Sequence, residues 1–112
     1  MIDAGDIGEI IAVYEKHGWI LRRVLLSPAL KKRVSENIAH FIVGMKVIDS
    51  DMDAAWFSRP QKQGGVPWEI RHLSETPFAL LENIDDESAE FEASLRSVES
   101  RLRETLLKSK SA

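Results

Sequence analysis

The stretch "PWEIRHLSETPFALLENI", residues 67–84, decides the fold. Its two ends, 67–73 and 78–84, are short runs of aromatic and aliphatic residues, which are typical of β-strands. The Ser-Glu-Thr-Pro segment between them has the residue types that form tight turns. The stretch therefore predicts an antiparallel hairpin. A similar run at 53–59, separated from it by a glycine-containing loop, extends the hairpin into a three-stranded antiparallel meander.

Helical periodicity predicts three helices outside the meander. Apolar residues recur at spacings of three and four positions in 6–17, 28–39 and 86–107. Asp6 and Glu9 have the spacing of a capping box, so we expect the first helix to begin there. A run of acidic residues at the start of the last helix would stabilise the positive end of its dipole.

Two more strands complete the prediction, a clear one at 19–26 and a short one at 47–48. The element order is then α-β-α-β-β-β-α, with the short strand as an addition. This order predicts an α+β fold, a two-layer sandwich in which an antiparallel or mixed sheet of four or five strands carries the helices on one face. We expect one small domain over 1–112, with a frayed C-terminal tail at 108–112.

Composition narrows the classes of function. The chain of 112 residues has a formal net charge of −3 and no cysteine, which excludes disulfides and cysteine metal sites. The acidic balance gives no general attraction to nucleic acid or to an anionic membrane, and no apolar run is long enough to span a bilayer. We therefore expect a soluble, cytoplasmic protein that binds neither nucleic acid nor membrane, and we expect no cofactor.

Each of the three tryptophans is followed by an arginine three positions later. The pairs are Trp19 with Arg22, Trp56 with Arg59, and Trp68 with Arg71. On a strand, positions three apart point to opposite faces of the sheet. The spacing therefore predicts that the meander carries its tryptophans on one face and its arginines on the other.

The arginine face of the meander mixes apolar and charged side chains. Its predicted members are Phe57, Arg59, Glu69, Arg71, Leu73 and Leu81. A surface of this kind often marks an interface or a ligand groove. We take it as the candidate ligand- or partner-binding site. The alternative is that the last helix or the loop at 60–66 folds over it.

Three aspartates at alternate positions, Asp49, Asp51 and Asp53, precede the meander. On an extended chain their carboxylates lie on one side, where a divalent cation would relieve their repulsion. The EF-hand pattern fails, because Ala54 and Pro60 stand where glycine and glutamate are required. We favour acids that face water and predict no metal, with a cation site as the alternative.

These observations favour a non-catalytic interaction or small-ligand-binding module that forms a homodimer. Self-association would use the arginine face of the meander or the C-terminal helix. The alternative is a small enzyme with a polar cluster at one end of the meander, consisting of Asp51, Asp53, Glu69, Arg71 and His72. The run from 53 to 82 resembles small bacterial proteins without an assigned function, and this resemblance implies no activity.

Overall fold

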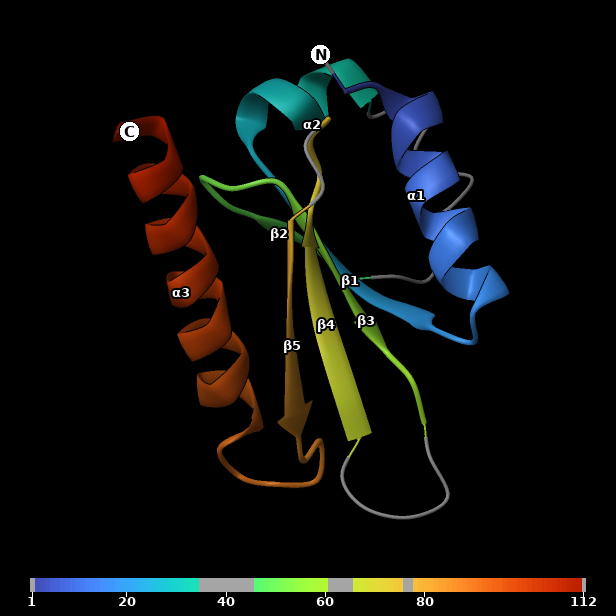
Figure 1. Ribbon diagram of the computed structural model, residues 1–112, viewed down its shortest axis with the longest axis vertical. Helices are drawn as coiled ribbons and strands as arrows, with labels where there is room; N and C mark the ends of the chain where they lie inside the picture. Colours follow the sequence, from blue (N-terminus) through green and yellow to red (C-terminus); the bar gives the residue numbers. More distant parts are fainter. Residues whose placement is uncertain (1, 35–45, 61–65, 76–77, 112) are drawn as a thin grey trace.

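The five strands form one mixed sheet in the order β2-β1-β3-β4-β5 (Figure 1). The computed structural model describes residues 2–34, 46–60, 66–75 and 78–111. β2 runs parallel to β1, and the other neighbouring strands are antiparallel. The strands are β1 (Ile20–Leu26), β2 (Lys46–Asp49), β3 (Ala54–Ser58), β4 (Val66–His72) and β5 (Ala79–Ile84). The predicted α+β class, mixed sheet and meander are confirmed.

The helix boundaries differ from the predicted ones at two N-termini. α1 is Ala4–Lys16, and its capping box is formed by Asp3 and Asp6 instead of Asp6 and Glu9. Either pair has the required spacing, so the sequence alone does not decide between them. α2 is Pro28–Val34, and the rest of the predicted helix at 28–39 lies outside the described residues.

α3, Phe91–Ser111, begins five positions after its predicted start at residue 86. The acidic residues before it form turns, in which the Asp85 carboxylate accepts the Glu87 amide at 2.9 Å. Aspartate side chains favour such local hydrogen bonds over the helix. At its other end α3 extends to Ser111, within the segment predicted to be a frayed tail.

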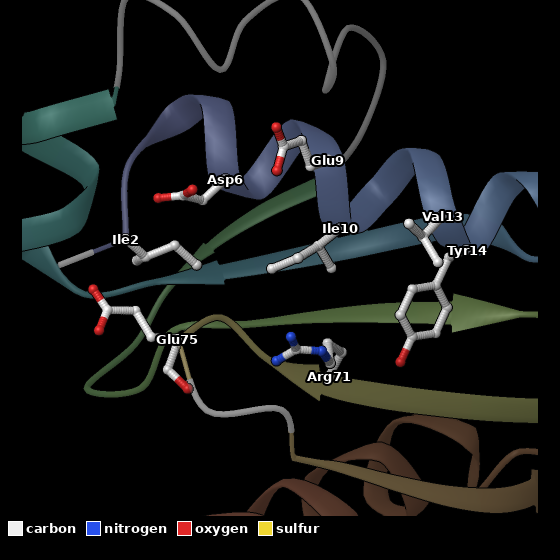
Figure 2. A pocket seen from close by; sticks show the side chains of 9 residues that line it. Ile2, Asp6, Glu9, Ile10, Val13, Tyr14, Arg71 and Glu75 are labelled. Carbon is white, nitrogen blue, oxygen red and sulfur yellow. The ribbon is translucent and has the colours of Figure 1, made fainter.

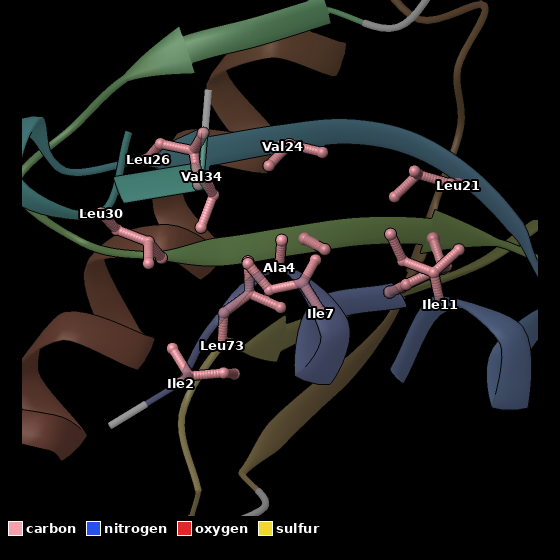
Figure 3. Close-up of a cluster of buried hydrophobic side chains, with 12 residues drawn as sticks. Ile2, Ala4, Ile7, Ile11, Leu21, Val24, Leu26, Leu30, Val34 and Leu73 are labelled. Atoms are coloured by element: carbon pink, nitrogen blue, oxygen red, sulfur yellow. The ribbon is translucent and has the colours of Figure 1, made fainter. Parts of the chain in front are cut away.

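The sheet has a hydrophobic core on each face, and successive residues of β3 show the division. Phe57 belongs to the core beneath α1 and α2, together with Leu30 and Val34 of α2. Trp56 belongs to the core beneath α3, where its indole Nε1 donates to Glu99 at 2.8 Å. We call these two sides the α1-side face and the α3-side face (Figure 1; the α1-side core is shown in Figure 3).

The helices therefore lie on both sides of the sheet. The single helical layer predicted from the sequence describes α1 and α2, which share one face, whereas α3 packs against the opposite one. The alternation of side chains along a strand explains the arrangement, because β3 is fully buried on both sides. A strand of that kind needs cover on each face.

An irregularity in β1 places its two neighbouring arginines, Arg22 and Arg23, on the same side of the sheet. The register with β3 shifts between Leu21 and Arg23. Arg22 donates to the Ser58 hydroxyl at 2.7 Å, and Arg23 binds Glu92 of α3 with two hydrogen bonds, at 2.8 and 2.7 Å. Both guanidinium groups therefore lie on the α3 side of the sheet. An extra residue in a strand breaks the alternation of side chains between the two faces of the sheet.

Candidate functional site

The register of the meander places the six predicted surface residues on one face, the α1-side face. Phe57 pairs with Glu69, and Glu69 pairs with Leu81. Arg71 and Leu73 follow Glu69 at steps of two, and Arg59 follows Phe57 in the same way. The two tryptophans of the meander lie on the α3-side face. Tryptophan and arginine are thus separated across β3 and β4, as the spacing predicted.

Part of this surface is covered by α1. Phe57 is fully buried, and its ring stacks on that of Tyr14 with centroids 4.0 Å apart and planes 11° from parallel. Leu73 is also buried in the α1-side core. Phe57 and Leu73, predicted as surface residues, therefore support the fold and do not face a partner.

The other part of the α1-side face is open. Leu81 is 59% exposed, and Ala79 and Asn83 beside it on β5 are exposed as well. Glu69 and Arg71 on β4 are partly exposed. We call these five residues the open half-face. α1 packs over β1 and β3, so the face is covered at its centre and uncovered towards the β5 edge (Figure 1).

A groove of about 480 Å³ lies where the open half-face meets α1 (Figure 2). Its volume is in the range of small-molecule sites. Val13 of α1, 58% exposed, forms part of its wall, and Arg71 of β4 lies across from α1. The residues that line it are Ile2, Asp6, Glu9, Ile10, Val13, Tyr14, Arg71, Ser74 and Glu75.

One hydrogen bond joins α1 to β4 at the side of the groove. The Tyr14 hydroxyl donates to the Glu69 carboxylate. Burial raises the pKa of Tyr14 above its ordinary value, and the hydrogen bond and negative charge of Glu69 raise it further, against a smaller opposing effect of Arg71. Tyr14 is therefore a neutral donor that holds Glu69, and it is poorly suited to act as a base.

The two arginines of the predicted surface have different surroundings. Arg71 lies in the groove, and its Nη1 donates to the carbonyl of His72. Arg59 is exposed and lies near the end of α1, where a Cβ atom on Gly18 would stand 3.5 Å from its Nε. Gly18 has a positive φ of 88°, which allows the tight turn into β1. Arg71 is thus the arginine available to a ligand in the groove.

The three aspartates have three separate roles. Asp49 pairs with Lys31 at 2.8 Å, and Asp51 pairs with Arg103 of α3 at 2.8 Å. The Arg103 guanidinium lowers the pKa of Asp51, chiefly through hydrogen bonding. Asp53 accepts the Ser27 amide at 2.6 Å, just before α2. Among the residues that the structure describes, no group of three acids or histidines could hold a metal ion.

The five polar residues considered as an enzyme site lie on opposite faces of the sheet. Asp51, Asp53 and His72 line a second cavity of about 240 Å³, next to Arg103 and the end of α3. Glu69 and Arg71 lie on the α1-side face, as their register with Phe57 and Ala55 shows. The five residues do not meet in one cavity.

Few features of the sequence indicate what α1 contributes to the groove. Ile10 and Tyr14 were expected on an apolar helix face, and both pack at the edge of the α1-side core. Their exposure to the groove follows from where α1 sits on the sheet. Tyr14 and Glu69 are separated by 55 positions, and no local pattern links them. Val13, an apolar residue next to Tyr14 that is exposed in the structure, is the sequence feature that could have indicated a second, uncovered apolar side of α1.

Comparison with known proteins supplies no relative from which a role could be transferred. No protein-family model, no curated protein and no solved structure matches the chain. Within the described part of the chain, no helix is both long and apolar enough to cross a membrane. The α1-side face itself is therefore the basis for assigning a function.

Proposed function

We propose that the protein is a non-catalytic binding module, which takes a small ligand or a partner on the α1-side face and forms a homodimer. The observation that carries the proposal is the uneven cover of this face. The same helix that buries Phe57 leaves Leu81 59% exposed and Val13 58% exposed. Exposed apolar groups beside charged ones are typical of interaction surfaces.

The chemistry of this face supports binding more than catalysis. Tyr14 has a raised pKa and donates to Glu69, and Arg71 donates to the chain at His72. Catalysis by acid or base needs a group that exchanges a proton with a substrate near working pH. The Tyr14 hydroxyl, with its raised pKa, does not do this, but it and the Arg71 guanidinium can both hold a ligand in place.

The homodimer is proposed to form through the open half-face. Leu81 lies on β5, an edge strand of the sheet, where unpaired backbone groups and an exposed leucine are available together. The C-terminal helix offers a competing surface at Leu107, which is also 59% exposed. These two leucines have equal exposure and lie on different elements, so they form a matched pair for a test.

Light scattering coupled to size-exclusion chromatography separates the two interfaces. We expect the wild-type protein to elute as a dimer, Leu81→Glu as a monomer and Leu107→Glu as a dimer. Circular dichroism should show that both variants are folded, since neither leucine is buried. A wild-type monomer at every concentration, or a dimer that only Leu107→Glu disrupts, would contradict the proposed interface.

The composition of the chain supports two further proposals, one on where the protein is located in the cell and one on which macromolecules it does not bind. The net charge of −3 favours neither nucleic acid nor anionic lipid, and we propose a cytoplasmic protein that binds neither. A gel-shift assay with mixed-sequence DNA and RNA, and sedimentation with anionic vesicles, should both show no binding at physiological salt. Binding in either assay would overturn this part of the proposal.

A further inference from the structure

β5 is an edge strand that lacks the features which usually protect the edge of a sheet. It is six residues long and pairs with β4 in an unbroken register. It contains neither proline nor lysine, and its single charged residue, Glu82, is paired with Arg101 of α3 at 3.0 Å. Edge strands are often shortened, bulged or charged, which prevents them from pairing with another chain. β5 is therefore open to a further strand.

β2, at the opposite edge of the sheet, is protected in the usual way. It has four residues, and the charged residues Lys46 and Asp49 stand at its two ends. Asp49 is also paired with Lys31 of α2 at 2.8 Å. The contrast indicates that β5, and not β2, is the edge available for strand pairing.

The register of the hairpin shows which backbone groups of β5 point outward. Opposite residues of an antiparallel pair alternately exchange two backbone hydrogen bonds and none. The His72 amide donates to the Phe78 carbonyl at 2.8 Å, so Leu80 and Glu82, at steps of two from Phe78, direct their backbone groups to β4. The residues between them direct their N–H and C=O groups away from the sheet. These residues are Ala79, Leu81 and Asn83.

The same three residues have exposed side chains, which belong to the open half-face. If β5 pairs antiparallel with β5 of a second copy and Leu81 lies opposite Leu81, then Ala79 lies opposite Asn83. This register pairs the outward backbone groups of all three residues. Other symmetric registers pair fewer of them, and one centred on Glu82 would place two like charges opposite each other.

The α3 side of this edge leaves room for the second copy. Ser94 and Ser97 are the residues through which α3 borders a groove of about 310 Å³ beside Glu82, and their side chains are short. Leu80 would lie opposite Glu82 of the second copy, whose carboxylate is held by the Arg101 of its own chain. Leu80 itself stays packed against the core beneath α3.

We propose that two copies pair through β5 in this antiparallel register, with Leu81 at the two-fold axis, and that the pairing joins their open half-faces into one surface. Directly opposite residues of an antiparallel pair lie on the same face, so both α1-side faces lie on one side of a continuous sheet. β4 and β5 of the two copies form the floor of this surface, and the two α1 helices form its walls. The inference rests on the proposed homodimer and gives it a register and a composite binding surface.

Cysteine cross-linking of the full chain tests the register, because the sequence has no cysteine of its own. Ala79→Cys mixed with Asn83→Cys should give a disulfide-linked dimer on mild oxidation. The Cα atoms of a hydrogen-bonded pair are about 5.5 Å apart, which a disulfide can span. Ala79→Cys alone is the control and should give little cross-linked dimer, since its two copies would be roughly 14 Å apart.

A proline variant distinguishes edge pairing from packing of the two faces against each other. Asn83→Pro removes one outward N–H and keeps Leu81 in place, and an edge strand tolerates proline where the N–H faces away from the sheet. We expect it to raise the dimer Kd about tenfold or more, because the hydrogen bond is lost at two symmetric places. Asn83→Ala is the matched control and should dimerise as the wild type does.

The possible failures separate the edge pairing from the homodimer itself. The edge pairing is wrong if the mixed cysteine variants cross-link no more than Ala79→Cys alone, or if a folded Asn83→Pro dimerises as tightly as Asn83→Ala. A homodimer that Leu81→Glu disrupts would still stand in that case. If Asn83→Pro does not fold, the cross-linking decides alone. If the wild type is a monomer at every concentration, both the inference and the proposed homodimer are wrong.

Discussion

Leu80 and Leu81 are neighbours on β5, and they have different environments. Leu80 points to the α3-side face and packs against the core beneath α3, whereas Leu81 points to the α1-side face and is 59% exposed. The two leucines are the same in chemistry and lie on the same strand. Their difference shows that the position of the helices, more than the hydrophobicity of the strand, decides which part of this sheet is free to bind.

The two faces of the sheet also differ in the polar contacts that hold their helices. α3 is tied to the sheet and its loops by several side chains, which include the Trp56–Glu99 hydrogen bond and the Arg23–Glu92 pair. The Arg23 guanidinium also lies 5.4 Å from the centre of the Phe91 ring. α1 is joined to β4 by the side-chain hydrogen bond from Tyr14 to Glu69. The α3-side face is thus held closed across β4 and β5, and the α1-side face is left open there.

The largest expected effect is the loss of either core aromatic of β3. Trp56→Ala and Phe57→Ala should each lower the free energy of unfolding by about 3–5 kcal/mol, because both side chains are fully buried, on opposite faces. Urea denaturation measures the change. Leu107→Ala is the control and should stay within about 0.5 kcal/mol, since its side chain is mostly exposed and lies outside the proposed dimer interface. A small effect of Phe57→Ala would mean that α1 does not cover β3.

Arg23→Ala should have the next largest effect, because it removes the link between β1 and α3. The Arg23 side chain is 14% exposed and makes two hydrogen bonds with Glu92. We expect a loss of about 1–2 kcal/mol in unfolding free energy. Arg96→Ala, on the same helix as Glu92, is the comparison and should cost less. Equal losses for the two variants would argue against a specific link.

Tyr14→Phe removes the hydrogen bond from Tyr14 to Glu69 and keeps the ring stacked on Phe57. We expect a loss of about 1 kcal/mol near neutral pH. Folding raises the pKa of Tyr14, so the folded state binds the phenolic proton more tightly than the unfolded state. This stabilisation is complete below about pH 10, the pKa of unfolded tyrosine, and is lost as the pH rises further.

The pH dependence can be checked with this single variant, since Tyr14 is the only tyrosine in the sequence. The difference in unfolding free energy between the wild type and Tyr14→Phe should shrink as the pH is raised above about 10. Urea denaturation in a series of alkaline buffers gives this difference. A gap that stays constant over the series would show that the hydroxyl is not held by Glu69.

Asp51→Asn should have the smallest effect. Its pair with Arg103 is exposed on both sides, and such pairs contribute a few tenths of a kcal/mol. The Arg103 guanidinium lowers the pKa of Asp51, so the contribution is present at neutral pH and is lost as the pH falls through the acidic range. Thermal melting at pH 7 and at low pH measures it. A large loss would assign Asp51 a role beyond this pair.

Much of the sheet could be predicted from the sequence, since the period of two along 53–59, 67–73 and 78–84 fixes both the strands and their faces. The order of the helices and strands along the chain could also be predicted. The side on which α3 packs could not, because the period of an amphipathic helix shows which face is buried but does not show against what. The irregularity between Leu21 and Arg23 leaves no local mark in the sequence either.

The candidate site could be predicted only in part. The pattern placed Glu69, Arg71 and Leu81 on a common face, which the register confirms. It could not show that α1 covers Phe57, or that Tyr14 and Val13 border a groove there, because these contacts join distant parts of the chain. The alternating aspartates suggested a cluster, but their partners separate them. These partners are Ser27 just before α2, Lys31 in α2 and Arg103 in α3.

The concentration dependence of the Leu80 and Leu81 methyl chemical shifts tests whether the protein self-associates through the open half-face. Both residues lie on β5, and of the two only Leu81 belongs to the open half-face. As the protein is concentrated, we expect the Leu81 methyl signals to move with self-association while those of Leu80 stay unchanged. Constant Leu81 signals together with moving Leu107 signals would contradict it, because self-association would then use the C-terminal helix.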